Sequence, residues 1–157
     1  MELRLYSFCS FYLSSIQQGI QTGHAAVDLV REYNKQGDES YRDMVNDWAD
    51  NHKTFIILNG GDHTGICAAR NIVEASTYPY RYFYESFGAL NGLLTCAVVL
   101  LPECVFNARF SKDATEVNDF DTYVYTPKDD WAPTVVYTPE HKCYDLIRLI
   151  RGSRLAS

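Results

Sequence analysis

The chain has 157 residues, of which 46% are hydrophobic and 22% charged, and its formal net charge is −6. This length and balance indicate one folded domain rather than a disordered chain. The acidic charge argues against a broad electrostatic grip on nucleic acid, which usually needs a basic surface.

The cysteines and the apolar segments together predict the cellular compartment of the protein. The cysteines are widely spaced and form no CxxC pair, which is typical of free thiols in a reducing compartment; they are Cys9, Cys67, Cys96, Cys104 and Cys143. The N-terminal residues lack the pattern of a signal peptide, and the longest apolar run is too short to span a bilayer. We therefore expect a cytosolic protein without membrane contacts.

The first elements are a buried strand and an amphipathic helix. Residues 3–13 mix apolar and aromatic side chains, which predicts the strand. The helix follows, with Ser15 as N-cap and Gln18 completing a capping box. Its apolar stripe is expected to pack inward; this stripe consists of Ile16, Ile20, Val27 and Val30.

The pattern then continues to alternate between helices and strands. A second helix starts near Ser40, and residues 53–58 predict a fully buried strand. A helix capped by Asp62 or Thr64 follows, then an alternating stretch at 78–85 and a buried strand at 93–101. Such alternation predicts an α/β protein with three layers, α/β/α, around a small mixed and mostly buried sheet of about four strands.

The last third of the sequence differs in character. We assign residues 1–103 to the α/β core and residues 104–157 to a C-terminal extension of strands and a helix. The tetrapeptide VYTP occurs at 124–127 and 136–139, and the second copy opens an amphipathic helix. The extension is expected to pack on the core or on a second subunit, which would make the protein a homo-oligomer.

A polar stripe runs along the first helix. It consists of Gln17, Gln21, His24 and Asp28, which fall within an arc of about 60°. Two interpretations stay open: a solvated helix face, or a ligand site at the carboxyl end of the first strand, where α/β folds place ligands. The histidines have no partner at ligand spacing, so we expect no metal site, and no cofactor motif is present.

The alternating stretch offers a further pair of interpretations. Tyr80, Tyr82 and Tyr84 share one face of the predicted strand, whereas Arg81, Phe83 and Glu85 share the other. The tyrosines either form a platform on which bases stack or simply fit a half-buried sheet, and we favour the second interpretation for most of them.

The order of these segments resembles the type 2 peptidyl-tRNA hydrolase family. The stretch QTGHA at 21–25 stands where that family has Gln-x-x-His-Ala. Trp48 and the strand at 53–58 also fit, as does TCAVVLLP at 95–102, whose Thr95 leads the last strand. Glu85 stands where the family has an aspartate. The resemblance covers about the first two-thirds of the chain.

This chain departs from that family at positions that the resemblance assigns to catalysis. The family has a Gly-Lys pair ahead of the glutamine, and the lysine is catalytic; this chain has Ile16 and Gln17 there. An uncharged amide stabilises a developing oxyanion less well than an ammonium does. Glu85 carries its carboxylate one methylene further out than aspartate, and the Arg-Thr of the family's next loop is replaced near Ala89 and Leu90.

These departures lead us to expect a binding protein that holds a nucleotide or an aminoacyl-adenosine-like molecule without turnover. The expected ligand-binding residues are Gln17, Gln21, His24, Arg81, Tyr82, Glu85, Asn91 and Thr95. The sequence is also similar to divergent phage members of the family, which raises the hypothesis of counter-defence in the host cytosol by sequestration of a signalling nucleotide. The acidic charge suits tRNA less well.

The alternative is a working peptidyl-tRNA hydrolase with rearranged chemistry. His24 would serve as general base, because the pKa of an imidazole lies near neutrality. Glu85 would orient that imidazole or a water molecule, and Thr95 would bind the substrate carbonyl.

Overall fold

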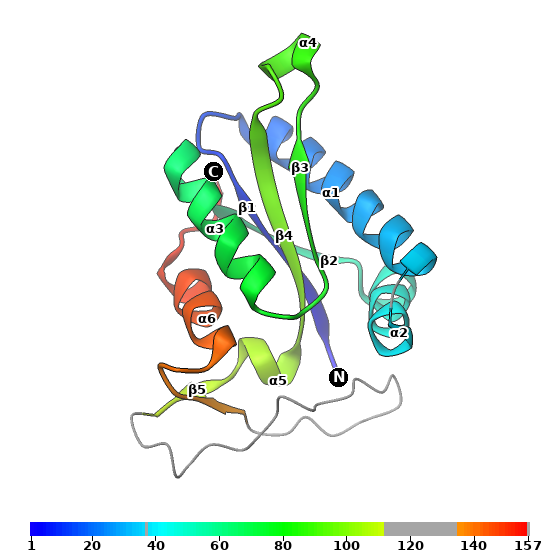
Figure 1. Ribbon diagram of the computed structural model, residues 1–157, viewed down its shortest axis with the longest axis vertical. Coiled ribbons are helices and arrows are strands. Elements are labelled where there is room, and N and C mark those ends of the chain that lie inside the picture. Colours follow the sequence, from blue (N-terminus) through cyan, green and yellow to red (C-terminus); the bar gives the residue numbers. More distant parts are fainter. Residues whose placement is uncertain (37, 112–134, 157) are drawn as a thin grey trace.

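The computed structural model describes residues 1–36, 38–111 and 135–156 (Figure 1). Its centre is a mixed four-stranded sheet in the order β2-β1-β4-β3. The strand bounds are Leu3–Cys9 (β1), Thr54–Asn59 (β2), Tyr80–Tyr84 (β3) and Leu94–Pro102 (β4). β1 runs parallel to β2 and antiparallel to β4, and β4 also pairs antiparallel with β3.

Helices cover both faces of this sheet, as Figure 1 shows. On one face lie α1 (Ser15–Gln36) and α2 (Glu39–Asp47), which continues into the π-helical turn η1 (Trp48–His52); on the other lie α3 (His63–Ala75) and α6 (Lys142–Gly152). The short elements are α4 (Phe87–Leu90), α5 (Glu103–Phe106) and a two-stranded parallel pair of β5 (Arg109–Phe110) and β6 (Val136–Tyr137). The expected three-layer α/β fold is therefore confirmed.

The two central strands explain why the sheet is buried on both faces. Along β1, Leu3 and Leu5 pack under α1 and α2, whereas Tyr6 and Phe8 pack under α3 and α6. Every residue of β4 is buried, as the continuous apolar run predicts. Among the described helices, none combines the length and the apolar character needed to cross a bilayer.

Two expectations about burial are wrong. Most of the apolar stripe of α1 faces outward, because Ile16 is 77% and Val27 58% exposed, and only Val30 packs partly against the core. The helix instead presents Ala25 and Leu29 to the sheet. Strand β2 is not fully buried either, because it forms an edge of the sheet and leaves Phe55 42% exposed.

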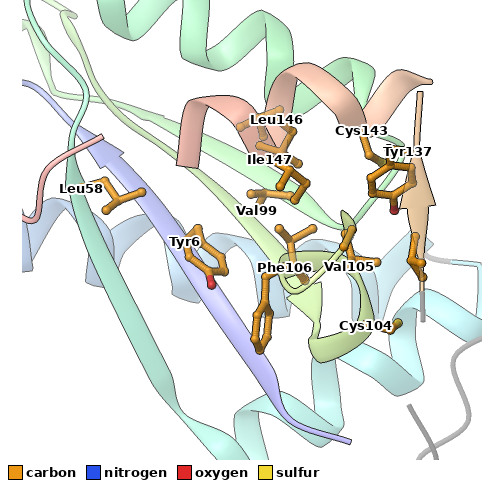
Figure 2. Packing of buried hydrophobic residues seen from close by; sticks show 14 of the residues in the cluster. Tyr6, Leu58, Val99, Cys104, Val105, Phe106, Tyr137, Cys143, Leu146 and Ile147 are labelled. Atoms are coloured by element: carbon orange, nitrogen blue, oxygen red, sulfur yellow. The ribbon is translucent and has the colours of Figure 1, made fainter. Parts of the chain in front are cut away.

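The described part of the C-terminal extension packs on the sheet beside α3. Leu146 and Ile147 of α6 lie over Val99 of β4, with Tyr137 next to them (Figure 2). The helix begins at Lys142 rather than at Pro139, because the imidazole of His141 caps it by accepting the N–H of Cys143. The first VYTP copy, at 124–127, lies outside the described residues.

The C-terminal tail protects the free edge of β2. The backbone N–H of Asn59 donates to the carbonyl of Arg154, and that of Ala156 donates to Ile57. These bonds satisfy backbone groups that an edge strand otherwise leaves open for pairing with another chain.

Candidate functional site

A cavity of about 360 Å³ opens where β1 ends and α1 begins, next to the turn between β3 and β4. We call it the amide pocket, after the glutamines in its wall. Its lining consists of Ser10, Tyr12, Leu13, Gln17, Gln21, Glu85, Leu90, Leu93 and Thr95. Four of the expected ligand-binding residues are thus brought together here, from α1, β4 and the end of β3.

A buried amide organises the floor of the amide pocket. The Gln21 Nε2 donates to Glu85 Oε2 over 2.8 Å, and the Thr95 hydroxyl donates to Gln21 Oε1 over 3.1 Å. Gln21 is 6% exposed and Thr95 is fully buried. Since the Thr95 Oγ1 also lies 3.2 Å from the Phe83 carbonyl, one amide links helix, strand and hairpin. The network fixes which end of the Gln21 amide is the donor.

Gln17 reaches the pocket from the capping box of α1. The backbone N–H and the hydroxyl of Ser14 both donate to Gln17 Oε1, and the Gln17 N–H donates to Ser14 Oγ. The N-cap is therefore Ser14 and its partner Gln17, one residue earlier than the expected pair of Ser15 and Gln18. With its oxygen engaged in the cap, the amide nitrogen of Gln17 is the group left to donate into the pocket.

Gln18 has a different role, which the sequence did not indicate. Its side chain is buried, and its Nε2 lies 3.3 Å from the carbonyl of Ser10 and 3.2 Å from that of Leu13. These bonds hold the connection between β1 and α1 that lines the amide pocket. Among the described residues, Gln18 Oε1 is the buried side-chain polar atom without a hydrogen-bond partner.

The carboxylate of Glu85 is held ionised at neutral pH. The backbone N–H of Ser86 and the Gln21 amide lower the pKa of Glu85 below its ordinary value, and the nearby charge of His24 acts in the same direction. Each carboxylate oxygen accepts one of these hydrogen bonds. Glu85 is therefore an acceptor in the pocket wall and a poor source of protons.

The other expected ligand-binding residues lie outside the amide pocket. His24 is exposed on α1, with its ring 4.8 Å from that of Phe83. Asn91 ends α4 in the left-handed conformation and is exposed. Arg81 and Tyr82 line a second cavity.

That second cavity, of about 340 Å³, lies further along α1 and β3. It is lined by Asp28, Arg31, Glu32, Lys35, Arg81 and Tyr82. Arg81 forms an ion pair of 2.8 Å with Glu32, so part of its charge is already compensated. We call this the basic pocket, because its lining has three basic and two acidic side chains.

The two faces of β3 are used as the alternation predicts. Three side chains of one face contact α1. Arg81 forms the ion pair with α1, Phe83 makes the ring contact, and Glu85 accepts the hydrogen bond from the amide of α1. The rings of Tyr80, Tyr82 and Tyr84 follow one another with centroid distances of 6.2 and 5.8 Å. Of the polar stripe of α1, Gln21 is therefore buried against the end of β3, whereas His24 touches Phe83 and stays exposed.

The residues that sequence reasoning missed are mostly apolar pocket walls. Tyr12 and Leu13 lie in the connection between β1 and α1, and Leu90 and Leu93 flank the turn before β4. Their position in the sequence could have identified these residues, because α/β folds place ligands at the loops that follow the carboxyl ends of strands. In the described part of the chain, no cluster of three or more His, Cys, Asp or Glu side chains is placed to hold a metal ion.

A comparison with models of known protein families found no match for this chain, and no curated protein matches its sequence.

Proposed function

We propose that the protein binds a nucleotide or an aminoacyl-adenosine-like molecule in the amide pocket and holds it without turnover. The observation that carries this proposal is the Gln21 amide, fixed between Glu85 and Thr95 at the floor of a 360 Å³ cavity. This volume falls within the range of about 300–1,000 Å³ that is usual for small-molecule sites.

The walls of the amide pocket define the chemistry of the bound group. Tyr12, Leu13, Leu90 and Leu93 provide apolar contacts for a planar or aliphatic moiety. The Gln17 nitrogen supplies a donor, and the ionised Glu85 accepts from amino or hydroxyl groups. A base, a ribose or an α-ammonium group fits this set, whereas a phosphate next to Glu85 would be repelled.

The anionic part of such a ligand would lie toward the basic pocket. Along α1, Gln21 is about 15 Å from Arg31 and about 21 Å from Lys35 at 1.5 Å per residue. A nucleoside in the amide pocket therefore needs one or more phosphates to extend as far as Arg31 and Lys35. This spacing favours a nucleotide over a free nucleoside.

The lining of the amide pocket is unsuited to ester hydrolysis. Among the described residues that line it, there is no lysine, arginine or histidine to stabilise a developing negative charge or to activate a water molecule. The single hydrogen of the Thr95 hydroxyl already has two acceptors within the protein, Gln21 Oε1 and the Phe83 carbonyl. These features favour retention of a ligand over its cleavage.

One observation favours hydrolysis as a second candidate function. His24 lies close enough to Glu85 to interact with it electrostatically, which brings an imidazole and a carboxylate together beside the amide pocket. In this alternative, His24 acts as general base on a water molecule, Glu85 orients it, and Thr95 holds the substrate carbonyl. The substrate would be peptidyl-tRNA or a related ester.

One experiment separates the two candidates. The full chain is incubated with a panel of linear and cyclic signalling nucleotides, with an aminoacyl-adenosine analogue and with labelled peptidyl-tRNA. Binding is measured by calorimetry, and the ligand is recovered after denaturation and checked by mass spectrometry. A bound nucleotide that is recovered unchanged supports the proposal. Cleavage of peptidyl-tRNA that is lost in His24→Ala would overturn it.

Two variants link binding to the amide pocket. Gln21→Ala is expected to weaken binding by about tenfold to a hundredfold, because it removes hydrogen bonds worth about 1–3 kcal/mol in a buried site. Glu140→Gln, on the exposed turn before α6, is the matched control and should bind like the wild type. Equal affinities in both variants would contradict the assignment.

A further inference from the structure

A small polar cluster lies in the core beneath the amide pocket. Ser7 and Cys9 of β1 face Thr22 of α1, and all three side chains are buried. The Ser7 and Thr22 hydroxyls lie 2.7 Å apart, and the Cys9 Sγ lies 3.3 Å from Thr22 Oγ1. Cys96 of β4 completes the cluster by donating its thiol hydrogen to the carbonyl of Gln21 over 3.3 Å.

The register of the sheet places the two cysteines directly opposite one another. Cys9 pairs with Cys96 in the antiparallel ladder of β1 and β4. In the next pair, the Ser10 N–H donates to the carbonyl of Thr95, so Cys9 and Cys96 occupy a non-hydrogen-bonded position. Cα atoms in such a position are about 4.5 Å apart, which lies within the range that a disulfide spans.

Both thiols also point in the same direction. Cys96 contacts the Gln21 carbonyl, and the Cys9 Sγ lies 3.7 Å from the carbonyl of Gln18, one helical turn earlier. Both side chains therefore face α1 from neighbouring strands, and the two sulfurs are close enough for each to shift the pKa of the other. A disulfide between them requires little movement of the backbone.

The surroundings activate one of the two sulfurs. The Cys96 thiol lowers the pKa of Cys9 to about 7, because its single hydrogen can turn from the Gln21 carbonyl to the ionised Cys9 sulfur, and the Ser7 and Thr22 hydroxyls act in the same direction against the effect of burial. The pKa of Cys96 is raised, mainly because Cys9 shares its proton. Cys9 is thus the sulfur with substantial thiolate character, which is the reactive form of cysteine.

We propose that Cys9 and Cys96 are an oxidation site at which a peroxide produces a reversible disulfide. The Cys9 thiolate attacks one oxygen of hydrogen peroxide, the O–O bond breaks, and the departing hydroxide takes up a proton to become water. The Cys96 sulfur then attacks the resulting sulfenic acid, the S–S bond forms, and the released hydroxide leaves as water with the Cys96 proton. Both sulfurs are oxidised, the peroxide is reduced, and a dithiol reverses the reaction.

Oxidation at this site changes contacts of the helix that lines the amide pocket. In the disulfide, neither sulfur retains a hydrogen to donate to the carbonyl of Gln18 or Gln21. The same turn of α1 carries the side chain that binds Glu85 and Thr95. The disulfide itself does not depend on the proposed ligand.

The test is peptide mapping of the folded full chain. Reduced protein is treated with hydrogen peroxide, quenched by alkylation and digested, and mass spectrometry identifies the linked peptides. We expect a linked peptide containing Cys9 and Cys96 that disappears on treatment with dithiothreitol. Cys9 should react at least about tenfold faster than Cys104, whose pKa is raised to about 11 by burial. A link that forms only in urea-unfolded protein, or oxidation confined to the other cysteines, would overturn the proposal.

Variants assign the order of the two steps. In Cys96→Ala, the first step stops at a sulfenic acid on Cys9, which dimedone should label. Cys104→Ala is the matched control, because it removes a buried cysteine from another part of the core and should leave the disulfide yield unchanged. Loss of the link in this control would refute the assignment. If Cys96→Ala fails to fold, mapping of the wild-type chain still decides the proposal.

Discussion

Thr95→Val tests the polar network at the floor of the amide pocket. Valine has nearly the same shape as threonine, so the change opens no cavity and removes only the hydroxyl. That hydroxyl is fully buried and donates to Gln21 Oε1 over 3.1 Å. Its loss leaves a buried acceptor without its donor, which costs about 1–3 kcal/mol. For a chain of this size, each kcal/mol lowers Tm by about 2–4 °C.

The measurement is urea denaturation of Thr95→Val and of Thr95→Ser, which keeps the hydroxyl and loses one methyl group. We expect the serine variant to lose about 1 kcal/mol through the missing methyl group alone. A double-mutant cycle with Gln21→Ala should give a coupling of about 0.5–3 kcal/mol, as is usual for residues in one network. A valine variant as stable as the wild type, or a coupling near zero, would refute the reasoning.

Three further predictions concern the pH response, the backbone and the helix cap. The folded-state pKa of Glu85 lies below the ordinary value of 4.5, so its stabilising contribution is complete above that pH and is lost as the pH falls through the folded-state pKa. The stability difference between wild type and Glu85→Gln should therefore shrink as denaturation is measured from about pH 7 down to about pH 3. Gly65→Ala should destabilise the protein by more than about 2 kcal/mol, because the added Cβ would collide with the Gly60 carbonyl. Gly23→Ala has open space around the added Cβ and should stabilise the protein by about 0.4–1 kcal/mol. Equal effects of the two substitutions in thermal unfolding would contradict this. Ser14→Ala removes the N-cap of α1 and should cost about 0.5–2 kcal/mol in urea denaturation; an unchanged midpoint would place the cap elsewhere.

The elements themselves were predictable because they depend on local patterns. The continuous apolar run of β4 indicated a strand buried on both faces, and it is one. Asp62 or Thr64 was expected to cap α3, and the cap is Asp62, whose carboxylate accepts the Gly65 N–H. The period of two along β3 placed Arg81 and Glu85 on the same face, which the structure turns toward α1. In each case the pattern that allowed the prediction lies within a few neighbouring residues of the chain.

The burial of α1 was not predictable from its apolar stripe. Ile16 and Val27 are exposed, whereas the polar Gln21 and Thr22 are buried. Buried polar groups need hydrogen-bond partners, and here those partners come from other elements, namely Glu85 and Thr95 for Gln21 and Ser7 for Thr22. A hydrophobic pattern within one helix contains no information about such partners.

The sequence by itself therefore determined the order and type of most elements, and it also pointed to the polar residues of α1 as candidates for a site. Only the tertiary structure decided which of those residues meet. Gln21 binds Glu85 and Thr95 across separations of 64 and 74 residues, and Cys9 meets Cys96 through the strand register. Local propensity acts over a few neighbouring residues, whereas these contacts depend on how the sheet aligns distant segments, and that alignment sets the shape and the chemistry of the amide pocket.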